Sequence, residues 1–127
     1  MKLTSNLTPA DREELLDRLK ECSEVNIIVI GRKTKKRFST PVWFVLEGEE
    51  KVILVPMKGS DNNWLKDLVK DPKIELSAGR SSLSSKATIV RDSNRVEKVL
   101  DKFREKYRSM WSESYYVKRD VYVEVPL

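Results

Sequence analysis

A run of basic residues offers the first chemistry in this sequence. Residues 31–37 read Gly-Arg-Lys-Thr-Lys-Lys-Arg, which places five cations around the hydroxyl of Thr34. Arginine can form two parallel hydrogen bonds to a phosphate or carboxylate, and lysine adds a point charge. The segment joins two expected strands, so these residues predict an anion-binding turn. A solvated hairpin tip without a ligand is the alternative interpretation.

A second candidate site is the segment Lys-Gly-Ser-Asp-Asn-Asn-Trp at residues 58–64, which joins an expected strand to an expected helix. Backbone N–H groups at the start of a helix attract anions, and a glycine such as Gly59 lets a ligand approach the main chain closely. Ser60 adds a hydroxyl donor. An N-capping segment that binds nothing is the alternative here.

Aromatic side chains form the third candidate. They gather near the C-terminus, at Tyr107, Trp111, Tyr115, Tyr116 and Tyr122. Such rings can wall a planar ligand by stacking, and a tyrosine can donate a proton. They can equally close a core or line a dimer contact. Trp43 and Phe44 are adjacent in an expected strand, so one ring should face inward and the other outward.

Composition excludes several classes of chemistry. The 127 residues contain no His and one Cys, Cys22. Ser-His-Asp hydrolases, HExxH zinc sites, intrachain disulfides and cysteine-based metal sites are therefore excluded, and we expect no metal. The chain carries 25 Lys+Arg against 20 Asp+Glu, a net charge of +5, which favours anionic partners such as phosphates, nucleic acid or acidic membrane surfaces. Nucleic acid, with lysine and arginine along its backbone and Trp43 or Tyr115 stacked on bases, is a less favoured alternative because the acidic residues dilute the charge.

The apolar runs are short, and the chain does not begin with the apolar stretch of a signal peptide. None of the runs approaches the ~20 residues that a membrane-spanning helix needs. We therefore expect a cytoplasmic protein without a membrane span, and its length fits one domain of residues 1–127.

The elements that must position these side chains alternate between two periodicities. Helical patterns cover residues 1–23, where Thr8 is the expected N-cap, and residues 60–71 and 92–110. Strand patterns fill residues 24–91 around the middle helix, and a last strand is expected at residues 115–126. The order predicts a mainly β (α+β) fold, a small closed antiparallel barrel of six or so strands with about three helices packed outside.

Four motifs in order give the chain a resemblance to a known family. They are the basic turn, Pro41-Val-Trp-Phe44, Lys58-Gly59 leading to Trp64-Leu-Lys-Asp-Leu68, and Asp71-Pro72. Together they resemble the deazaflavin-dependent nitroreductase family between about Gly31 and Arg119. The resemblance implies the FMN-binding split β-barrel fold of pyridoxamine 5'-phosphate oxidase-like proteins. It implies hydride transfer from reduced coenzyme F-420, or alternatively FMN, to a small unsaturated, quinone-like or nitroaromatic electron acceptor.

The resemblance also implies roles for individual residues. The phosphate and acidic tail of the cofactor would be held by Arg32, Lys33, Thr34 and Arg37. The ring would be flanked by Pro41, Val42 and Trp43, and the ring or ribityl chain contacted by Lys58, Gly59 and Ser60. Trp64 and Asp67 would anchor the covering helix, and Tyr115 or Tyr116 would donate a proton. By the same analogy we expect a homodimer.

The sequence departs from the family pattern at five positions. Lys35 and Ser60 stand where the family has Gly, Asp67 where it has Asn, and Met110 and Glu113 where it has Tyr. A negative Asp67 facing the acidic tail would weaken cofactor binding. A cofactor-free split barrel that acts as a binding protein is therefore a further alternative.

Overall fold

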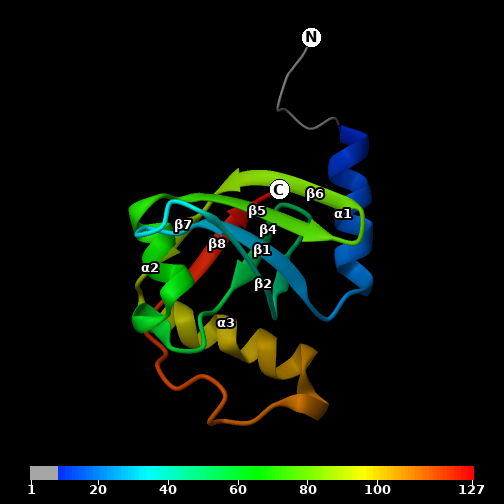
Figure 1. Cartoon of the computed structure of the whole chain (residues 1–127). Coiled ribbons are helices and arrows are strands. Elements are labelled where there is room, and N and C mark those ends of the chain that lie inside the picture. The colour runs from blue at the N-terminus through cyan, green and yellow to red at the C-terminus, as the bar shows by residue number, and fades with distance from the viewer. Residues whose placement is uncertain (1–8) are drawn as a thin grey trace.

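The computed structural model describes residues 9–127, which form eight strands in two antiparallel sheets, with three α-helices and two short 3-10 turns (Figure 1). The helices are α1 (Pro9–Glu21), α2 (Asn63–Lys70) and α3 (Ser93–Lys106), and the 3-10 turns are η1 (Gly59–Asp61) and η2 (Arg108–Met110). The strands are β1 (Val25–Ile30), β2 (Arg37–Val42), β3 (Val45–Glu47), β4 (Lys51–Leu54), β5 (Lys73–Ala78), β6 (Ser81–Lys86), β7 (Thr88–Val90) and β8 (Tyr122–Pro126).

The two sheets have the strand orders β2-β1-β5-β6 and β3-β4-β8-β7. No strand pairing joins one sheet to the other among the described residues, so the expected closed barrel is corrected to two separate sheets. The expectation of about six strands becomes eight, because the chain bends from one sheet into the other twice, between β2 and β3 and between β6 and β7.

The first bend lies at Trp43 and Phe44, between β2 and β3. The main chain of Phe44 has side-chain partners there: its N–H donates to the Tyr107 hydroxyl at 2.9 Å, and its carbonyl accepts from the Lys106 ammonium at 2.8 Å. At the second bend, the N–H of Ala87 donates to the Pro72 carbonyl at 2.8 Å. Both bends are thus stabilised by distant segments.

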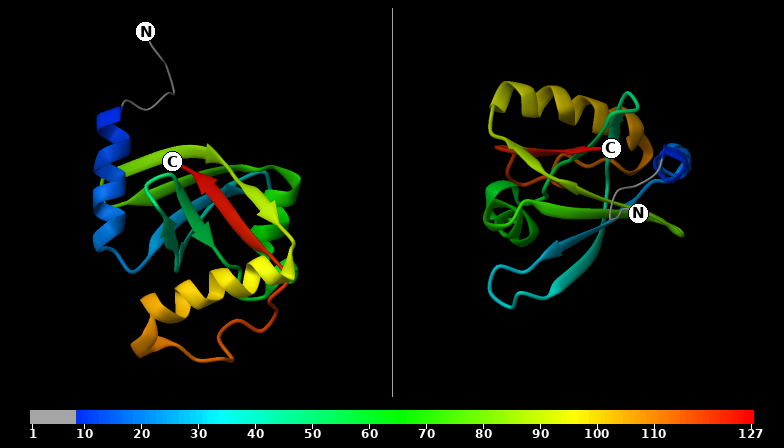
Figure 2. Two further views of the ribbon diagram at one scale, coloured as in Figure 1. Left: turned by 180° about the vertical axis from the view of Figure 1, so that it is seen from behind. Right: turned by 90° about the horizontal axis from the view of Figure 1, so that it is seen from above.

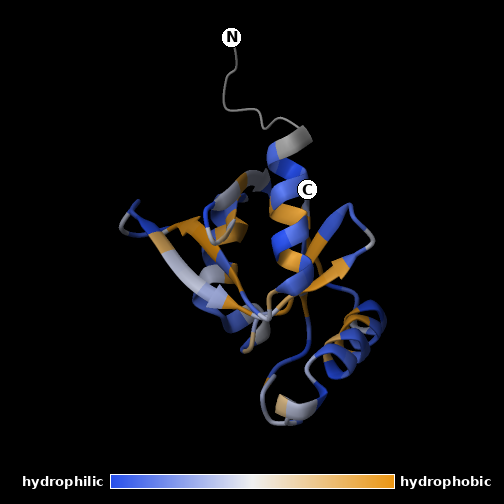
Figure 3. Ribbon diagram, turned by 90° about the vertical axis from the view of Figure 1, so that its right-hand side faces the viewer, coloured by the Kyte–Doolittle hydropathy of each residue, from blue (hydrophilic) through white to orange (hydrophobic). Residues whose placement is uncertain are grey.

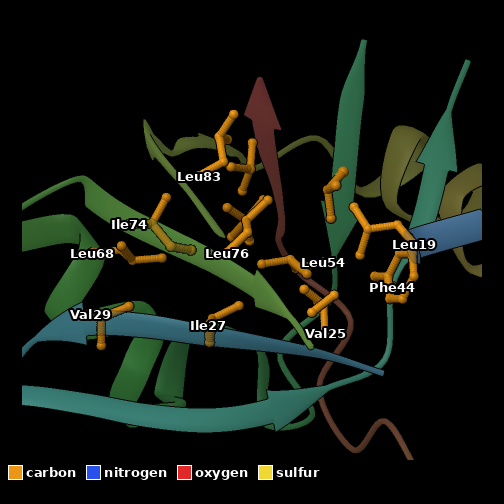
Figure 4. Packing of buried hydrophobic residues seen from close by; sticks show 14 of the residues in the cluster. Leu19, Val25, Ile27, Val29, Phe44, Leu54, Leu68, Ile74, Leu76 and Leu83 are labelled. Atoms are coloured by element: carbon orange, nitrogen blue, oxygen red, sulfur yellow. The ribbon is translucent and has the colours of Figure 1, made fainter. Parts of the chain in front are cut away.

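The main core lies between the two sheets, and α1 and α2 pack against it from opposite ends (Figures 2 and 4). Period-two burial places Val25, Ile27 and Val29 in this core, while Asn26 between them is exposed. Phe44 is fully buried against the same cluster, so it is the inward ring of the Trp43–Phe44 pair. Coloured by hydropathy, the hydrophobic (orange) stretches lie largely on the strands, whereas the connecting loops are mainly hydrophilic (Figure 3).

The helix α3 covers the other face of the second sheet (Figure 2). Asp92 caps it by accepting hydrogen bonds from the N–H groups of Asn94 and Arg95 at 3.0 and 3.3 Å. The helix is shorter than the predicted span of 92–110: it ends at Lys106, and the turn η2 follows. At the other end of the chain, the expected N-cap Thr8 lies outside the described residues.

The last strand is shorter than expected. It begins at Tyr122 rather than at residue 115, and residues 107–121 form a loop that contains η2 (orange in Figure 1). The loop is attached to the segment after β4, where the N–H of Val117 donates to the Met57 carbonyl at 2.9 Å. The middle helix is also shorter: η1 and α2 replace the predicted span of 60–71. Between residues 9 and 127, no helix combines the length and apolar character needed to cross a membrane.

Candidate functional site

A groove runs between the basic turn and the start of α2. Its larger part has a volume of about 730 Å³ and is lined by Arg32, Lys33, Thr34, Lys58 and Asp67 among others; we call this part the anion end. Its smaller part, of about 240 Å³, is lined by Pro41, Val42, Trp43, Tyr115 and Tyr116 among others; we call this part the aromatic end. The two parts share Thr40, Asn62 and Trp64 and so are continuous.

The basic turn is ordered by its own hydrogen bonds. The N–H of Gly31 donates to the Lys36 carbonyl at 2.8 Å, and the N–H of Lys35 donates to the Gly31 carbonyl at 2.9 Å. A Cβ at Gly31 would lie 2.5 Å from a ring carbon of Phe38 and 2.7 Å from the Thr34 hydroxyl oxygen. The turn therefore requires glycine at this position.

Lys35 closes the turn in a backbone conformation that normally suits glycine. Its φ angle is +63°, and it is the one non-glycine residue with positive φ in the described chain. This left-handed conformation costs an L-residue with a side chain about 1–2 kcal/mol. The ammonium of Lys35 folds back and donates to the Arg32 carbonyl at 3.2 Å. Lys35 thus keeps the left-handed backbone conformation of the glycine that the family has at this position.

Asp67 on α2 holds the turn against the helix. Its Oδ1 accepts from the backbone N–H of Arg32 at 3.1 Å and from the Arg32 guanidinium at 2.7 Å, and the residue is 7% exposed. The guanidinium also donates to the Asn63 carbonyl at 3.3 Å. The negative charge of Asp67 is therefore paired within the protein, and the positive charge of Arg32 is largely neutralised with it.

Two lysines leave positive charge open to the groove. Lys33 and Lys58 are exposed, and within residues 9–127 neither ammonium has a hydrogen-bond or ion-pair partner. The backbone N–H of Lys58 is already bound to the Asn62 side-chain oxygen at 3.0 Å. Lys58 therefore offers its side chain, rather than its main chain, to a ligand.

Three of the predicted site residues do not line the groove. Arg37 pairs with Glu75 at 3.0 Å, beside a separate surface hollow. The Ser60 hydroxyl and N–H both donate to Asp120, at 2.6 and 3.0 Å, and a Cβ at Gly59 would collide with the same carboxylate. Burial acts to raise the pKa of Asp120, but the bonds from Ser60 outweigh it and lower that pKa. The Asp120 carboxylate thus takes up the hydroxyl and N–H donors of Ser60 that the sequence predicted for a ligand anion.

Three parallel rings build the aromatic end. Trp43 stacks on Tyr107 with ring centroids 4.1 Å apart and planes 3° apart, and on Tyr115 at 4.4 Å and 6°. Tyr107 is 1% exposed, and its hydroxyl donates toward the carbonyls of Ser23 and Phe44 at 2.8 and 2.9 Å. Burial raises the pKa of Tyr107 to about 12, so the ring is neutral and fixed.

Tyr116 stands next to this stack. Its ring meets that of Tyr115 edge-on at 5.2 Å, and it is 3% exposed. Burial raises the pKa of Tyr116, so its hydroxyl keeps its proton at neutral pH. Tyr116 lines the aromatic end, and its hydroxyl has no hydrogen-bond partner among residues 9–127, so position, not acidity, makes it a candidate proton donor.

The loop that carries both tyrosines is held by arginines. Arg104 donates to the Glu113 carboxylate at 3.3 Å, and Arg119 donates to the carbonyls of Glu113 and Tyr116 at 2.6 and 3.2 Å. Hydrogen bonds from Trp111 and Arg104 lower the pKa of Glu113. Of the two residues that stand where the family has Tyr, Glu113 therefore fixes the loop through its hydrogen bonds. The other, Met110, has an exposed side chain.

Thr40 and Met57 line the groove but belong to none of the predicted candidate sites. Asn62 and Tyr107 lie within the second and third candidate sites, although neither was given a role; Asn62 lines both parts of the groove, and Tyr107 supports Trp43 from beneath. Among the described residues, no group of acidic or cysteine side chains could hold a metal.

Comparison with known proteins relates this groove to a family. The family model for F420H2-dependent quinone reductases matches residues 11–127. A solved structure of an F420-H2 dependent reductase is 21% identical, covers 81% of this chain and 93% of its own, and superposes with a TM-score of 0.63. A structure named as an F420 reductase is 15% identical over 82% and 86% of the two chains, with a TM-score of 0.61.

The fold is shared more widely. A protein of the pyridoxinephosphate oxidase family from Clostridium acetobutylicum is 14% identical, covers 94% of this chain and 85% of its own, and has a TM-score of 0.66. No curated protein matches the chain in sequence. The resemblance drawn from the four motifs is confirmed, both for the reliance on F-420 and for the fold of pyridoxamine phosphate oxidase-like proteins.

Proposed function

The chain belongs to the F420H2-dependent quinone reductase family, and from that membership we propose that its groove holds reduced F-420 against a small quinone-like acceptor. The observation that carries the proposal is the polarity of the groove. Unpaired cations line one end and parallel aromatic rings line the other. An F-420 molecule has the same polarity, because a planar ring is joined through a ribityl chain to a phosphate and an acidic tail.

The residues of the anion end fit the charged part of the coenzyme. Lys33 and Lys58 would bind phosphate or carboxylate oxygens directly, and the Thr34 hydroxyl can donate a further bond. Arg32 is committed to Asp67, so it would act chiefly by fixing the turn. The volume of about 730 Å³ lies within the range of ligand-binding clefts.

The aromatic end fits the ring. Pro41, Val42 and Trp43 present apolar and aromatic surface there, and Trp64 forms the boundary between the two parts of the groove. A ring in this part would lie beside Tyr115 and Tyr116. Apolar walls would also exclude water from the reacting atoms.

The coenzyme, when bound, supplies the hydride. The chain would hold the acceptor beside the ring and complete the reduction with one proton, since a quinone needs one hydride and one proton to become a hydroquinone. We assign that proton to the Tyr116 hydroxyl, because the residue lines the aromatic end and within residues 9–127 its hydroxyl has no other hydrogen-bond partner. Tyr115 is the alternative donor. Nitroaromatic and other unsaturated acceptors fit the same requirement.

The proposed activity is tested by an anaerobic assay in which the protein oxidises reduced F-420 in the presence of a soluble benzoquinone. We expect quinone-dependent appearance of the oxidised deazaflavin, with a markedly lower turnover number in Tyr116→Phe and unchanged coenzyme binding. Oxidation at the uncatalysed rate at every protein concentration would refute the assignment. Parallel assays with reduced FMN show whether FMN can replace F-420, and assays with a nitroaromatic acceptor show whether it can replace the quinone.

We also propose that the chain works as a homodimer in the cytoplasm. The exposed edge strand β2, which runs along the groove and carries the half-exposed Phe38, supports an interface on this side. Sedimentation equilibrium measures the mass directly: twice the chain mass is expected, and the chain mass alone would exclude the dimer.

A further inference from the structure

We propose that the Tyr115 ring covers the face of Trp43 on which a planar ligand would stack. Such a ligand must displace Tyr115 to bind there. The inference rests on the proposed function, because it takes the ligand of the aromatic end to be a planar ring. It identifies Tyr115 as a residue that sets affinity and selectivity for that ring.

Both faces of the Trp43 indole are covered by the protein itself. Tyr107 lies on one face at 4.1 Å and Tyr115 on the other at 4.4 Å, each within 6° of parallel. Only the edge of the indole is left for a ligand. This geometry is the one that a stacked ligand ring would adopt, so Tyr115 occupies a ready-made position for it.

The two tyrosines on Trp43 are held very differently. Tyr107 is the C-cap residue of α3 and is almost fully buried. Its hydroxyl accepts from the N–H of Phe44 and donates toward the carbonyls of Phe44 and Ser23. Tyr115 is half-buried, and within residues 9–127 its hydroxyl has no hydrogen-bond partner. Its ring contacts Trp43 and Tyr116 at the edge of the cluster beneath α3. Of the two, Tyr115 is the ring that can leave.

The surrounding loop permits such a movement. Residues 111–121 contain no helix or strand, and the backbone N–H of Tyr115 makes a single turn bond to the Ser112 carbonyl at 3.0 Å. Two residues later, Val117 is 72% exposed. The anchors of the loop, the Glu113 ion pairs and the bond from Val117 to Met57, lie on either side of Tyr115 and need not break.

The size of the aromatic end points the same way. Its volume of about 240 Å³ is below the roughly 300–1,000 Å³ of typical ligand sites. Removing the Tyr115 ring would enlarge this space and uncover one face of Trp43. A ligand that cannot replace the lost stacking would bind poorly, so the arrangement selects for extended planar rings.

The test compares binding of oxidised F-420 to the wild-type protein, Tyr115→Ala, Tyr115→Leu and Tyr115→Phe by equilibrium dialysis. Losing a stacked pair corresponds to roughly a two- to tenfold change in affinity. We expect Tyr115→Ala and Tyr115→Leu to bind more tightly by this factor, whereas Tyr115→Phe, which keeps the ring, stays at the wild-type value. Near-ultraviolet circular dichroism should show the signal of the stacked rings lost when the wild-type protein is saturated.

The outcomes separate this inference from the proposed function. If the wild-type protein binds F-420 and the Ala and Leu variants bind it equally or more weakly, the displacement is wrong and the function stands. A stacked-ring signal that persists at saturation overturns the displacement as well. If no protein in the series binds F-420, the proposed function is wrong and this inference falls with it.

Discussion

The two ends of the groove are built in contrasting ways. The anion end is built mainly on one turn of consecutive residues, ordered by hydrogen bonds between Gly31, Lys35 and Lys36 and attached to α2 through Asp67, and Lys58 faces it from the segment after β4. The aromatic end joins Trp43 to Tyr107 and Tyr115, which lie more than sixty positions away in one loop, and its outermost ring, Tyr115, is held by ring contacts without a hydrogen bond to its hydroxyl within the described residues. We infer that ligand affinity is concentrated at the anion end, whereas the aromatic end combines a rigid inner layer with a movable outer one.

The largest effect should come from removing the open charges of the anion end. We expect Lys33→Ala combined with Lys58→Ala to weaken F-420 binding by at least about a hundredfold, because each charge-assisted bond contributes about 1.5–3 kcal/mol. The free energy of unfolding should not change, since neither ammonium has a partner within the described chain. Equilibrium dialysis and urea denaturation measure the two quantities.

Lys66→Ala combined with Lys70→Ala is the matched control, because it removes the same charge from α2 at residues that do not line the groove. Equal weakening by both pairs would show that net charge, and not the groove, governs binding.

Asp67 tests how the turn is attached to the helix. Asp67→Ala leaves the N–H of Arg32 without its acceptor and its guanidinium with the Asn63 carbonyl but no carboxylate, so we expect a loss of about 2–3 kcal/mol in the free energy of unfolding. Asp67→Asn keeps an acceptor oxygen and removes the negative charge, so it should lose less stability and bind F-420 more tightly. Tighter binding by the Ala variant than by the Asn variant would contradict this account.

Tyr107 tests the rigid layer of the aromatic end. In Tyr107→Phe the ring stays under Trp43, but the buried N–H of Phe44 loses its acceptor. We expect a loss of about 1–2 kcal/mol in the free energy of unfolding, measured by urea denaturation, with F-420 affinity within twofold of wild type. An unchanged unfolding free energy would mean that the hydroxyl does not stabilise the bend between β2 and β3.

The smallest effect concerns the strain in the turn. Lys35→Gly relieves the positive φ and should raise the free energy of unfolding by about 1 kcal/mol, part of the strain being offset by the greater chain entropy of glycine. Lys36→Gly, at a neighbour without positive φ, should lower it. A thermal melt of both variants distinguishes them, and destabilisation by both would show that Lys35 carries no strain.

What the sequence predicted correctly was mostly local. The basic turn follows from consecutive residues, and Arg32, Lys33 and Thr34 do line the groove. The segment at Gly59 and Ser60 has an equally local anion signature, but Asp120, sixty residues away, satisfies it. Only tertiary structure could reveal that competition.

The same distinction explains the errors in the fold. The strand β1 follows from its β-branched run, which matches Val25–Ile30. The bend at Phe44 depends on Tyr107 and Lys106, which are more than sixty positions away, and so it was not predictable from the run of apolar residues around it. Likewise Tyr116 has the residue type of a strand, yet its ring packs into the cluster beneath α3 and its backbone remains in a loop.

The most direct test of the central claim is a titration of the purified protein with F-420, followed by tryptophan fluorescence. Trp43 and Trp64 line the groove, so ligand binding there should quench the emission. We predict saturable quenching by F-420, a much weaker response to FMN, and loss of the F-420 response in the Lys33→Ala, Lys58→Ala double variant. No quenching by F-420, or an undiminished response in the double variant, would contradict the account.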